Sequence, residues 1–466
     1  MTLIAVVGGG ISGLAAAHHA REIASAESLE AKVTVFERSP RVGGCIETRR
    51  DDGFVLELGS DSLATEKVAA TQLAARLGLE LQPIDEAFRG TCVVRDGRLV
   101  RMPDEFRLFA PTSLRALMTS GLFTPGGMLR AALEPLVPPR KDTADESLAS
   151  FVTRRFGREV LDRLAQPLLG GIYSGDPAKL SLQATMPQLA QIEQKYGSLV
   201  RGMRALTKSA PSGPRLVSIR GGLGALTDAL VARLHADIRT NVAVTELRRS
   251  GKGWDLSLSD GTHVAADAVI CALPAYAAAE LLHPLEPELA RKLAAIEYHS
   301  IATVTTVFDA REVPELPVST GFVVPAIERR PMMAATFSSR KYAGRTLPGF
   351  EVLRAFIGGG AAESLVSADD ETLTRIVANE FREILGLEAL PKFVVVRRWL
   401  RAMPEYAVGH RARIDDIERL ADSLANFALA GSAYRGVGIA DCIRGGEAAA
   451  IQTVSSVPSS AIAHGP

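Results

Sequence analysis

The chain has 466 residues, of which 47% are hydrophobic and 23% charged, as is typical of a globular protein with two or three domains. Lysine and arginine together number 53, and aspartate and glutamate also number 53, so no overall charge attracts nucleic acid or an anionic membrane. The four cysteines lie far apart with no CxxC pair, which argues against a zinc site and a disulfide framework: Cys45, Cys92, Cys271 and Cys442.

The ends and the hydropathy of the chain bear on its location. It starts directly on an apolar strand, without the basic and then apolar leader of a secreted protein. It contains no run of about twenty apolar residues that could cross a bilayer. We therefore expect a protein in a reducing, cytoplasmic compartment, either soluble or in peripheral contact with the inner face of the cell membrane. The sequence leaves open whether it is a monomer or a homodimer.

A glycine-rich turn follows the first predicted strand, at residues 3–7. The turn is Gly8-Gly9-Gly10-Ile11-Ser12-Gly13, and a helix starts at Leu14. In such a turn Gly8 permits the tight bend, Gly10 lets the backbone approach a pyrophosphate, and Gly13 lets the helix pack closely on the strand. The helix N-terminus, with Ile11 and Ser12, offers free N–H groups to the anion. The pattern predicts a dinucleotide site, and a turn without a ligand is the alternative.

An acidic residue, Glu37, closes the second predicted strand at 33–36. Its spacing from Gly13 is near that at which a carboxylate reaches an adenosine ribose hydroxyl, and a carboxylate disfavours a 2′-phosphate. The loop that follows carries Arg38, Arg41, Gly43 and Gly44, which could lie against the cofactor phosphates. A plain surface turn is the alternative for this loop.

The next part of the chain changes from strands to helices. A strand at 53–59 and a helix at 66–77 precede a hairpin at 93–101, which the Asp96-Gly97 pair predicts. From 102 to about 204 the chain reads as helices broken by proline and glycine, at 114–122, 128–136, 147–156 and 160–164.

One apolar cluster in this helical stretch has two interpretations. It could lie in a bilayer interface or line a channel, but helices of this kind usually pack on their own domain, which we favour. The cluster comprises Leu114, Leu117, Met118, Leu122, Phe123, Met128, Leu129 and Leu133, with Arg115 and Arg130 among them.

The rest of the chain returns twice to strand-and-helix patterns. A helix at 220–234 is followed by a strand at 238–247, a hairpin and a strand at 268–272. The stretch from 300 to about 399 is rich in strands, with one helix at 371–385. A strand at 427–431 ends in Gly431, and a second glycine-rich junction at 436–443 opens an alanine-rich helix. The N–H groups of that helix could face the pyrimidine edge of a flavin, and ordinary strand-to-helix packing is the alternative.

These motifs resemble a known superfamily. Residues 8–14, with Glu37, Arg41, Gly43 and Gly44, resemble the flavin-containing amine oxidases, which bind FAD. Val242 sits where that superfamily uses the backbone of a strand valine to meet the adenine. Within the superfamily, four stretches are similar to the protoporphyrinogen oxidase family, and the resemblance spans about residues 3 to 455: 170–177, 180–181, 406–410 and 436–443.

The resemblance implies an α/β fold with a Rossmann-like FAD-binding domain, a second β-sheet domain for the substrate and a helical insertion. The FAD-binding domain would comprise 1–50, 221–284 and 407–458, and the substrate domain 51–92, 205–220 and 285–406. The insertion would cover 93–204, and a disordered tail 459–466. In addition to the residues above, Gly431, Val437, Gly438 and Ile439 would contact the cofactor.

The resemblance also implies an activity. Family members oxidise a porphyrinogen to a porphyrin by the loss of six electrons, with O2 as acceptor and H2O2 as product, in haem biosynthesis. We expect FAD to be non-covalent, because Cys442 lies late in the 436–443 junction. We assign no acid–base pair and no metal. An amine oxidase, a carotenoid-desaturase-like enzyme and a non-enzymatic flavin-binding module are the alternatives.

By the same resemblance, four residues would contact the substrate. Gly171 would allow close backbone approach, Tyr342 would stack on a ring, and Val323 would line the wall. Lys67 is our candidate at the rim for a propionate, and a solvated helix residue is the alternative. Residues 121–123 and 193–199 look like the bacterial branch that oxidises coproporphyrinogen III. Thr91 stands where the plant and animal branch has an arginine that holds a propionate of the substrate. We therefore do not predict that contact for this chain.

Overall fold

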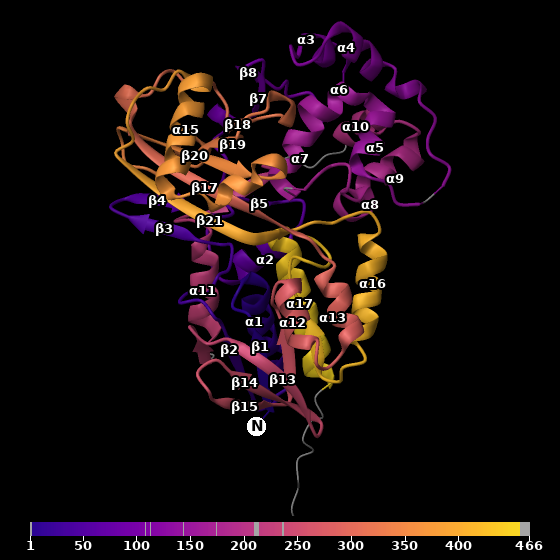
Figure 1. Cartoon of the computed structure of the whole chain (residues 1–466), viewed down its shortest axis with the longest axis vertical. Coiled ribbons are helices and arrows are strands. Elements are labelled where there is room, and N and C mark those ends of the chain that lie inside the picture. Colours follow the sequence, from indigo (N-terminus) through magenta and orange to yellow (C-terminus); the bar gives the residue numbers. More distant parts are fainter. Residues whose placement is uncertain are drawn as a thin grey trace, which may run out of the picture.

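A parallel sheet of five strands forms the lower part of the molecule in Figure 1. Its order is β12 (Asp237–Arg239), β2 (Ala31–Phe36), β1 (Thr2–Val7), β16 (Ala268–Cys271) and β22 (Phe427–Leu429). The computed structural model describes residues 2–107, 109–111, 113–142, 144–173, 175–208, 214–234 and 237–456. Ser174 of the 170–177 motif and the predicted tail lie outside these ranges.

The central strand β1 shows why this sheet is apolar throughout. Ile4 and Val6 pack in the core under α1 (Ile11–Ala26), α11 (Gly224–Leu234) and α17 (Ile439–Ser456). Ala5 and Val7 point to the opposite face, and a parallel sheet covered on both faces reads as a continuous apolar run. That face is covered by β13 (Val244–Ser250), β14 (Gly253–Leu258), β15 (His263–Ala266), α12 (Ala275–Leu282), α13 (Pro287–Ala294) and α16 (His410–Ala421).

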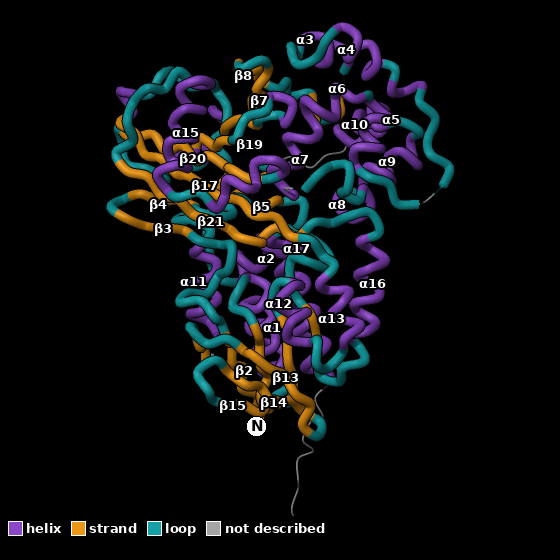
Figure 2. Tube along the Cα trace, in the orientation of Figure 1, coloured by secondary structure: helices purple, strands orange, loops and turns teal. Residues whose placement is uncertain are grey.

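A second, seven-stranded sheet lies above the parallel sheet, and α15 (Asp370–Leu385) packs on one of its faces (Figures 1 and 2). Its neighbours pair antiparallel except β18 and β7, which are parallel. The strand order is β21 (Phe393–Pro404), β17 (Tyr298–Asp309), β20 (Phe350–Gly358), β19 (Met332–Phe337), β18 (Gly321–Val323), β7 (Cys92–Arg95) and β8 (Arg98–Arg101).

Several short elements lie outside the two large sheets. One small sheet has the order β5 (Leu63–Ala64), β11 (Leu216–Ile219) and β6 (Leu81–Pro83), and β3 (Thr48–Asp51) pairs with β4 (Phe54–Glu57). The remaining short elements are α2 (Ala69–Arg76), α14 (Ser338–Lys341), η1 (Glu86–Phe88), η4 (Ala310–Glu312), η5 (Ala326–Glu328) and η6 (Gly360–Ser367).

The helical part, purple at the upper right of Figure 1, has its own core. Its centre holds buried charges: the Arg155 side chain bonds Glu134 and Glu193, and all three are inaccessible to solvent or nearly so. Its elements are β9 (Phe106–Arg107), β10 (Ala110–Pro111), α3 (Leu114–Thr119), α4 (Pro125–Ala132), η2 (Glu134–Leu136), α5 (Leu148–Phe156), α6 (Arg158–Val160), η3 (Leu161–Ala165), α7 (Gln166–Tyr173), α8 (Leu182–Thr185), α9 (Pro187–Tyr196) and α10 (Leu199–Lys208).

Two local predictions differ from the structure. The hairpin at 93–101 forms as β7 and β8, but β7 pairs with β18, so the hairpin lies in the seven-stranded sheet and not among the helices where we placed it. The strand predicted at 238–247 is two strands, β12 and β13. Between them Asn241 has a φ of +58°, and the Val242 N–H donates to the Glu37 carbonyl. The wider division of the chain into domains stays a prediction.

The apolar cluster of the helical part divides between two environments. Leu117, Leu122 and Phe123 are buried in the core, as we favoured. Met118, Leu129 and Leu133 are exposed, and so is Leu136 beside them. Within the described residues, no helix combines the length and apolar character needed to span a bilayer.

Candidate active site

The turn between β1 and α1 has the geometry that its glycines predict. A Cβ on Gly13 would lie 1.9 Å from the Gly8 carbonyl oxygen, so only glycine lets the helix approach the strand this closely. Gly8 has a φ of +109°, a backbone conformation that favours glycine.

The packing of the protein itself does not require glycine at position 10. Its φ of −70° suits any residue, and a Cβ there would have its nearest protein neighbour, the Gly44 Cα, 4.0 Å away. The space beside Gly10 is therefore open, while no side chain caps the N-terminus of α1. An uncapped helix N-terminus beside open space fits a pyrophosphate, because the free N–H groups and the helix dipole both stabilise an anion.

Glu37 lies beside this turn at the end of β2. Its two carboxylate oxygens accept hydrogen bonds of 2.8 Å each, one from the Gly9 N–H and one from the Ser39 N–H. The Val242 N–H donates to the Glu37 carbonyl over 3.0 Å, so two of the predicted cofactor residues are joined directly. Each carboxylate oxygen has a further lone pair, which leaves Glu37 able to accept from ribose hydroxyls.

The loop after Glu37 is held against the turn. The Gly43 N–H donates to the Gly9 carbonyl over 2.8 Å, and a Cβ on Gly44 would lie 3.2 Å from the Gly10 Cα. The Arg41 guanidinium bonds the carbonyls of three residues in its own loop and the Glu47 carboxylate at 2.7 Å. Arg41 therefore shapes the loop, and Arg38 is exposed.

The second glycine-rich junction leads into α17. Gly431 and Gly436 have φ values of +144° and +148°, and a Cβ on Gly436 would lie 2.4 Å from the Asp441 carboxyl carbon. The stretch from Gly436 to Ile439, which includes Val437 and Gly438, is only partly buried. It lies between the core under the parallel sheet, which Ile439 contacts, and the core of the helical part, which Val437 contacts.

Cys442 lies in the first turns of α17. Burial raises the pKa of its thiol to about 12. Because the thiolate is the nucleophile in cysteine chemistry, this thiol is poorly suited to attach a flavin covalently.

Together these features fit FAD. The open space beside Gly10, the uncapped N-terminus of α1 and the Glu37 carboxylate converge at the carboxyl ends of β1 and β2. Ligands of doubly wound sheets bind at that edge. When bound, the flavin would supply hydride acceptance and the reaction with oxygen.

Two of the predicted substrate residues lie where the helical part meets the seven-stranded sheet. Gly171, in α7, is exposed, and a Cβ there would meet nothing within 4 Å. Val323, in β18, is partly buried and packs against the core of the helical part. Contacts of α7 with β18 and β19 bring both residues to one interface.

The other two have polar partners within the chain. Tyr342 is only 2% exposed, and its hydroxyl bonds the Ser62 hydroxyl at 2.7 Å. Its ring has no open face on which a macrocycle could stack, which favours the alternative that it is a core residue. Lys67 precedes α2 and forms an ion pair with Asp441 in the first turn of α17, while half of its side chain is exposed; its contact with a propionate stays a prediction.

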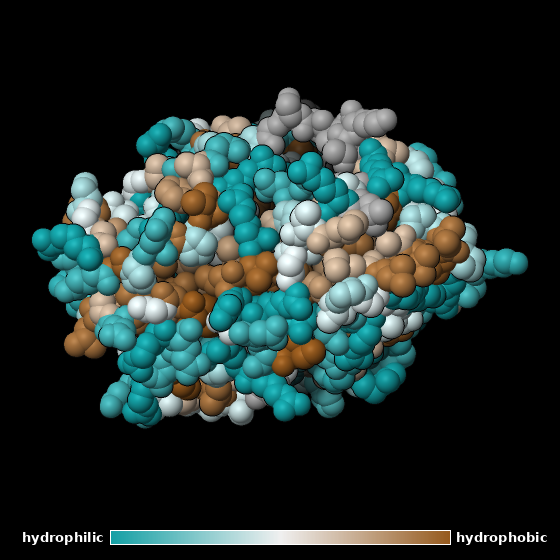
Figure 3. Space-filling model, turned by 90° about the horizontal axis from the view of Figure 1, so that it is seen from above, coloured by the Kyte–Doolittle hydropathy of each residue, from teal (hydrophilic) through white to brown (hydrophobic). Residues whose placement is uncertain are grey.

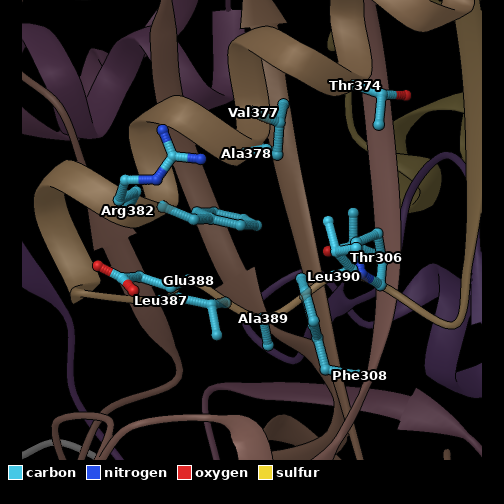
Figure 4. A pocket seen from close by; sticks show the side chains of 12 residues that line it. Thr306, Phe308, Thr374, Val377, Ala378, Arg382, Leu387, Glu388, Ala389 and Leu390 are labelled. Carbon is cyan, nitrogen blue, oxygen red and sulfur yellow. The ribbon is translucent and has the colours of Figure 1, made fainter.

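A small pocket lies elsewhere, between α15 and β17 (Figure 4). Thr306 and Phe308 line it from β17, and none of the predicted site residues does. Thr303, on the opposite face of β17, donates its hydroxyl to the Leu58 carbonyl. Because successive side chains of a strand alternate between faces, the pocket faces away from that contact.

His299, Glu363 and Glu405 form a cluster of ionisable groups that the sequence does not predict. The two ring nitrogens of His299 lie 2.9 Å from Glu363 and 2.9 Å from Glu405. These bonds, first that to Glu405, raise the pKa of His299 to about 9. His299 lies 64 positions from Glu363 and 106 from Glu405, and no spacing in the sequence signals these contacts.

Comparisons with known proteins agree with this geometry. The chain matches the family model of flavin containing amine oxidoreductases over residues 11–452. It is 35% identical over 456 residues to coproporphyrinogen III oxidase of Bacillus subtilis, covering 96% of each chain. It is 28% identical to protoporphyrinogen oxidase 2, chloroplastic/mitochondrial, of Arabidopsis thaliana, over 98% of this chain and 94% of that one.

Two solved structures share the fold. One, from Exiguobacterium and proposed to be a protoporphyrinogen oxidase, has a TM-score of 0.88 and 31% identity, covering 97% of this chain and 99% of its own. The other, cyclohexylamine oxidase of Brevibacterium oxydans, has a TM-score of 0.71 at 17% identity and covers 97% of this chain and 98% of its own. At that identity the second structure shows the fold alone.

The two glycines of the first turn should respond differently to substitution. Gly10→Val should fold, because a Cβ there comes no nearer than 4.0 Å to its closest protein neighbour, but should lose flavin, because the side chain fills the space for the pyrophosphate. Gly13→Ala should fail to fold stably, since its Cβ would overlap the Gly8 carbonyl. Thermal unfolding and the flavin absorbance of the purified variants measure the two effects. A folded Gly10→Val protein with stoichiometric flavin would contradict this site.

The His299 cluster should make stability depend on pH. Because the pKa rises from 6.5 to about 9 on folding, the stabilisation is fully present below pH 6.5 and is lost as the pH rises through about 9. The free energy of unfolding should fall over that interval by up to about 3 kcal/mol. Urea unfolding at several pH values measures the loss, and His299→Gln should flatten it. An equal slope in both proteins would show that other groups cause the dependence.

Proposed function

The chain belongs to the flavin containing amine oxidoreductase family, and on that premise we propose that it oxidises coproporphyrinogen III to the porphyrin, with FAD as cofactor and O2 as acceptor. As a family member it is a flavin-dependent oxidoreductase. The observation that carries the proposal is the 35% identity to a coproporphyrinogen III oxidase over 96% of both chains, together with a turn whose geometry fits FAD.

The reaction sets clear demands on the protein. A porphyrinogen loses six electrons and six protons, so three two-electron cycles are needed, each ended by reduction of O2 to H2O2. The chemistry of each cycle belongs to the cofactor, and the chain must bind and orient a large apolar macrocycle. Gly171 and Val323 support such a role, because they bring open space and an apolar wall to one interface. Tautomerisation of the macrocycle can deliver protons to solvent, so we assign no catalytic acid–base pair.

Lys67 is our proposed contact for a substrate carboxylate. Its ammonium has three donors, and the ion pair with Asp441 leaves donors for a second carboxylate. Half of the Lys67 side chain is exposed, at 51%. An ion pair in that environment is screened by water, so its contribution to binding is modest.

An amine substrate has less support. Cyclohexylamine oxidase shares the fold at 17% identity, whereas the relatives near 30% identity act, by their names, on porphyrinogens. No observation at the site favours an amine over a porphyrinogen, so we propose a single function.

We propose a cytoplasmic location without membrane insertion. The charge of the chain is balanced, and much of the apolar surface of the helical part is buried in its own core. The exposed residues Met118, Leu129, Leu133 and Leu136, which we call the apolar patch, lie on the adjoining elements α3, α4 and η2. Figure 3 views the molecule from above, where brown apolar side chains are interspersed with teal hydrophilic ones.

Purified protein mixed with vesicles of anionic phospholipid should therefore stay in the supernatant after sedimentation. The balanced charge gives no overall electrostatic attraction, and the apolar patch consists of only four side chains. Sedimentation of most of the active protein would contradict the proposal. Loss of that sedimentation in a variant with Leu129→Ser and Leu136→Ser would then identify the patch as the contact.

Coproporphyrinogen III should be turned over at least as efficiently as protoporphyrinogen IX. It carries four propionates against two, and Thr91 in place of an arginine predicts a wider, more solvated mouth. Lys67→Ala should lower kcat/KM for coproporphyrinogen III by roughly two- to tenfold, and by less for protoporphyrinogen IX.

The measurement is aerobic turnover of both substrates, followed by porphyrin fluorescence. Lys252→Ala, which removes an exposed lysine in the β13–β14 hairpin, serves as a matched control and should change neither value. Strong preference for protoporphyrinogen IX would overturn the choice of substrate. Bound flavin without turnover of either substrate would overturn the proposed function.

A further inference from the structure

A single tyrosine hydroxyl holds both ends of the 432–436 turn, which leads into α17. Tyr406 follows the end of β21 and is 1% exposed. Its hydroxyl donates to the Ser432 carbonyl over 2.6 Å and accepts from the Gly436 N–H over 2.9 Å. Because burial raises the pKa of Tyr406, the hydroxyl keeps its proton and serves as donor and acceptor at once.

A histidine on the same segment holds the middle of the turn. The rings of Tyr406 and His410 are stacked, with centroids 3.9 Å apart and planes 15° apart. The Nε2 atom of His410 lies 3.1 Å from the Tyr434 carbonyl. Burial lowers the pKa of His410 to about 4, so a neutral imidazole donates this bond at physiological pH. Tyr406 and His410 thus bond three alternate residues of one turn.

The backbone of the same segment is anchored to the helical part. The Ser181 N–H donates to the Tyr406 carbonyl over 2.7 Å, and the Val408 N–H donates to the Lys179 carbonyl over 2.8 Å. Asp145 accepts from the Gly409 N–H over 2.9 Å and from the Ser181 hydroxyl over 2.6 Å. Residues 406–410 are therefore fixed from one side by the helical part while they hold the 432–436 turn on the other.

We propose that Tyr406 is a positioning residue for the flavin: its hydroxyl fixes the 432–436 turn, and thereby the backbone at Gly436–Ile439 and the start of α17, where the cofactor binds. The inference rests on the proposed flavin chemistry. Without the hydroxyl, the Ser432 carbonyl and the Gly436 N–H lose a buried partner, and the turn gains freedom to move. The N-terminal N–H groups of α17 would then be held less firmly against the negative charge that a flavin gains on reduction.

The chain offers a matched control in the turn itself. Tyr434 is also buried, but its hydroxyl has no hydrogen-bond partner among the described residues. Its side chain packs in the core on the other face of the parallel sheet, with Cys271 and Phe427. Tyr434→Phe removes the same atom as Tyr406→Phe but breaks no bond to the turn.

The experiment compares the wild type with Tyr406→Phe and Tyr434→Phe. The measurements are the dissociation constant of FAD in reconstituted apoprotein, the reduction potential of the bound flavin and the thermal unfolding of each apoprotein. For Tyr406→Phe we expect FAD binding about tenfold weaker or more, and a lower reduction potential. For Tyr434→Phe we expect both values to equal those of the wild type.

Equal FAD binding and equal potentials in the two variants would overturn the proposal, even if Tyr406→Phe unfolds at a lower temperature. If Tyr406→Phe does not accumulate, His410→Phe provides the second test, because it keeps the stacked ring and removes the bond to the Tyr434 carbonyl. It should weaken FAD binding in the same direction, and wild-type binding would overturn the proposal. A wild type that binds no flavin at all would instead refute the proposed function.

Discussion

The arrangement of the site depends on the close approach of Gly13 to the Gly8 carbonyl. A Cβ at Gly13 would lie 1.9 Å from that oxygen, so α1 packs directly on the backbone at the end of β1. This contact directs the uncapped N-terminus of α1 to the space beside Gly10. Because β1 is the central strand of the parallel sheet, the same contact places the cofactor at the middle of the sheet edge, where Glu37 on β2 lies within reach.

The parts of the site that are local in sequence could be predicted from it. The glycines and Glu37 follow a strand–turn–helix pattern whose backbone requirements are tied to residue type, and the structure has that geometry. Arg41 shows the limit of such reasoning. A cation near a phosphate site suggests an anion contact, yet its guanidinium bonds carbonyls of its own loop and Glu47. Packing decides whether a side chain already has hydrogen-bond partners within the protein, and the motif does not encode that packing.

Residues whose partners are distant in the chain could not be placed in this way. Lys67 pairs with Asp441 across 374 positions, and the Ser62 hydroxyl meets Tyr342 across 280. The hairpin at 93–101 was predicted as a hairpin, but its neighbour β18 lies more than two hundred residues later. Tyr406 lies in the 406–410 motif, which resembles the family but does not indicate what the tyrosine does. Its hydroxyl makes two hydrogen bonds because the segment after β21 packs against the 432–436 turn, and the sequence does not show that these segments are neighbours.

The strand order of the parallel sheet has a consequence for synthesis on the ribosome. The edge strand β22 and the helix α17 come from the last forty residues, yet they cover β16 and pack along α1 from the first thirty. The nucleotide site therefore cannot be completed until α17 has been made. The helices between 113 and 208, by contrast, form one core from contiguous sequence. During translation the N-terminal apolar strands remain partly uncovered until α17 has been made, and apolar surface exposed in this way is prone to aggregation.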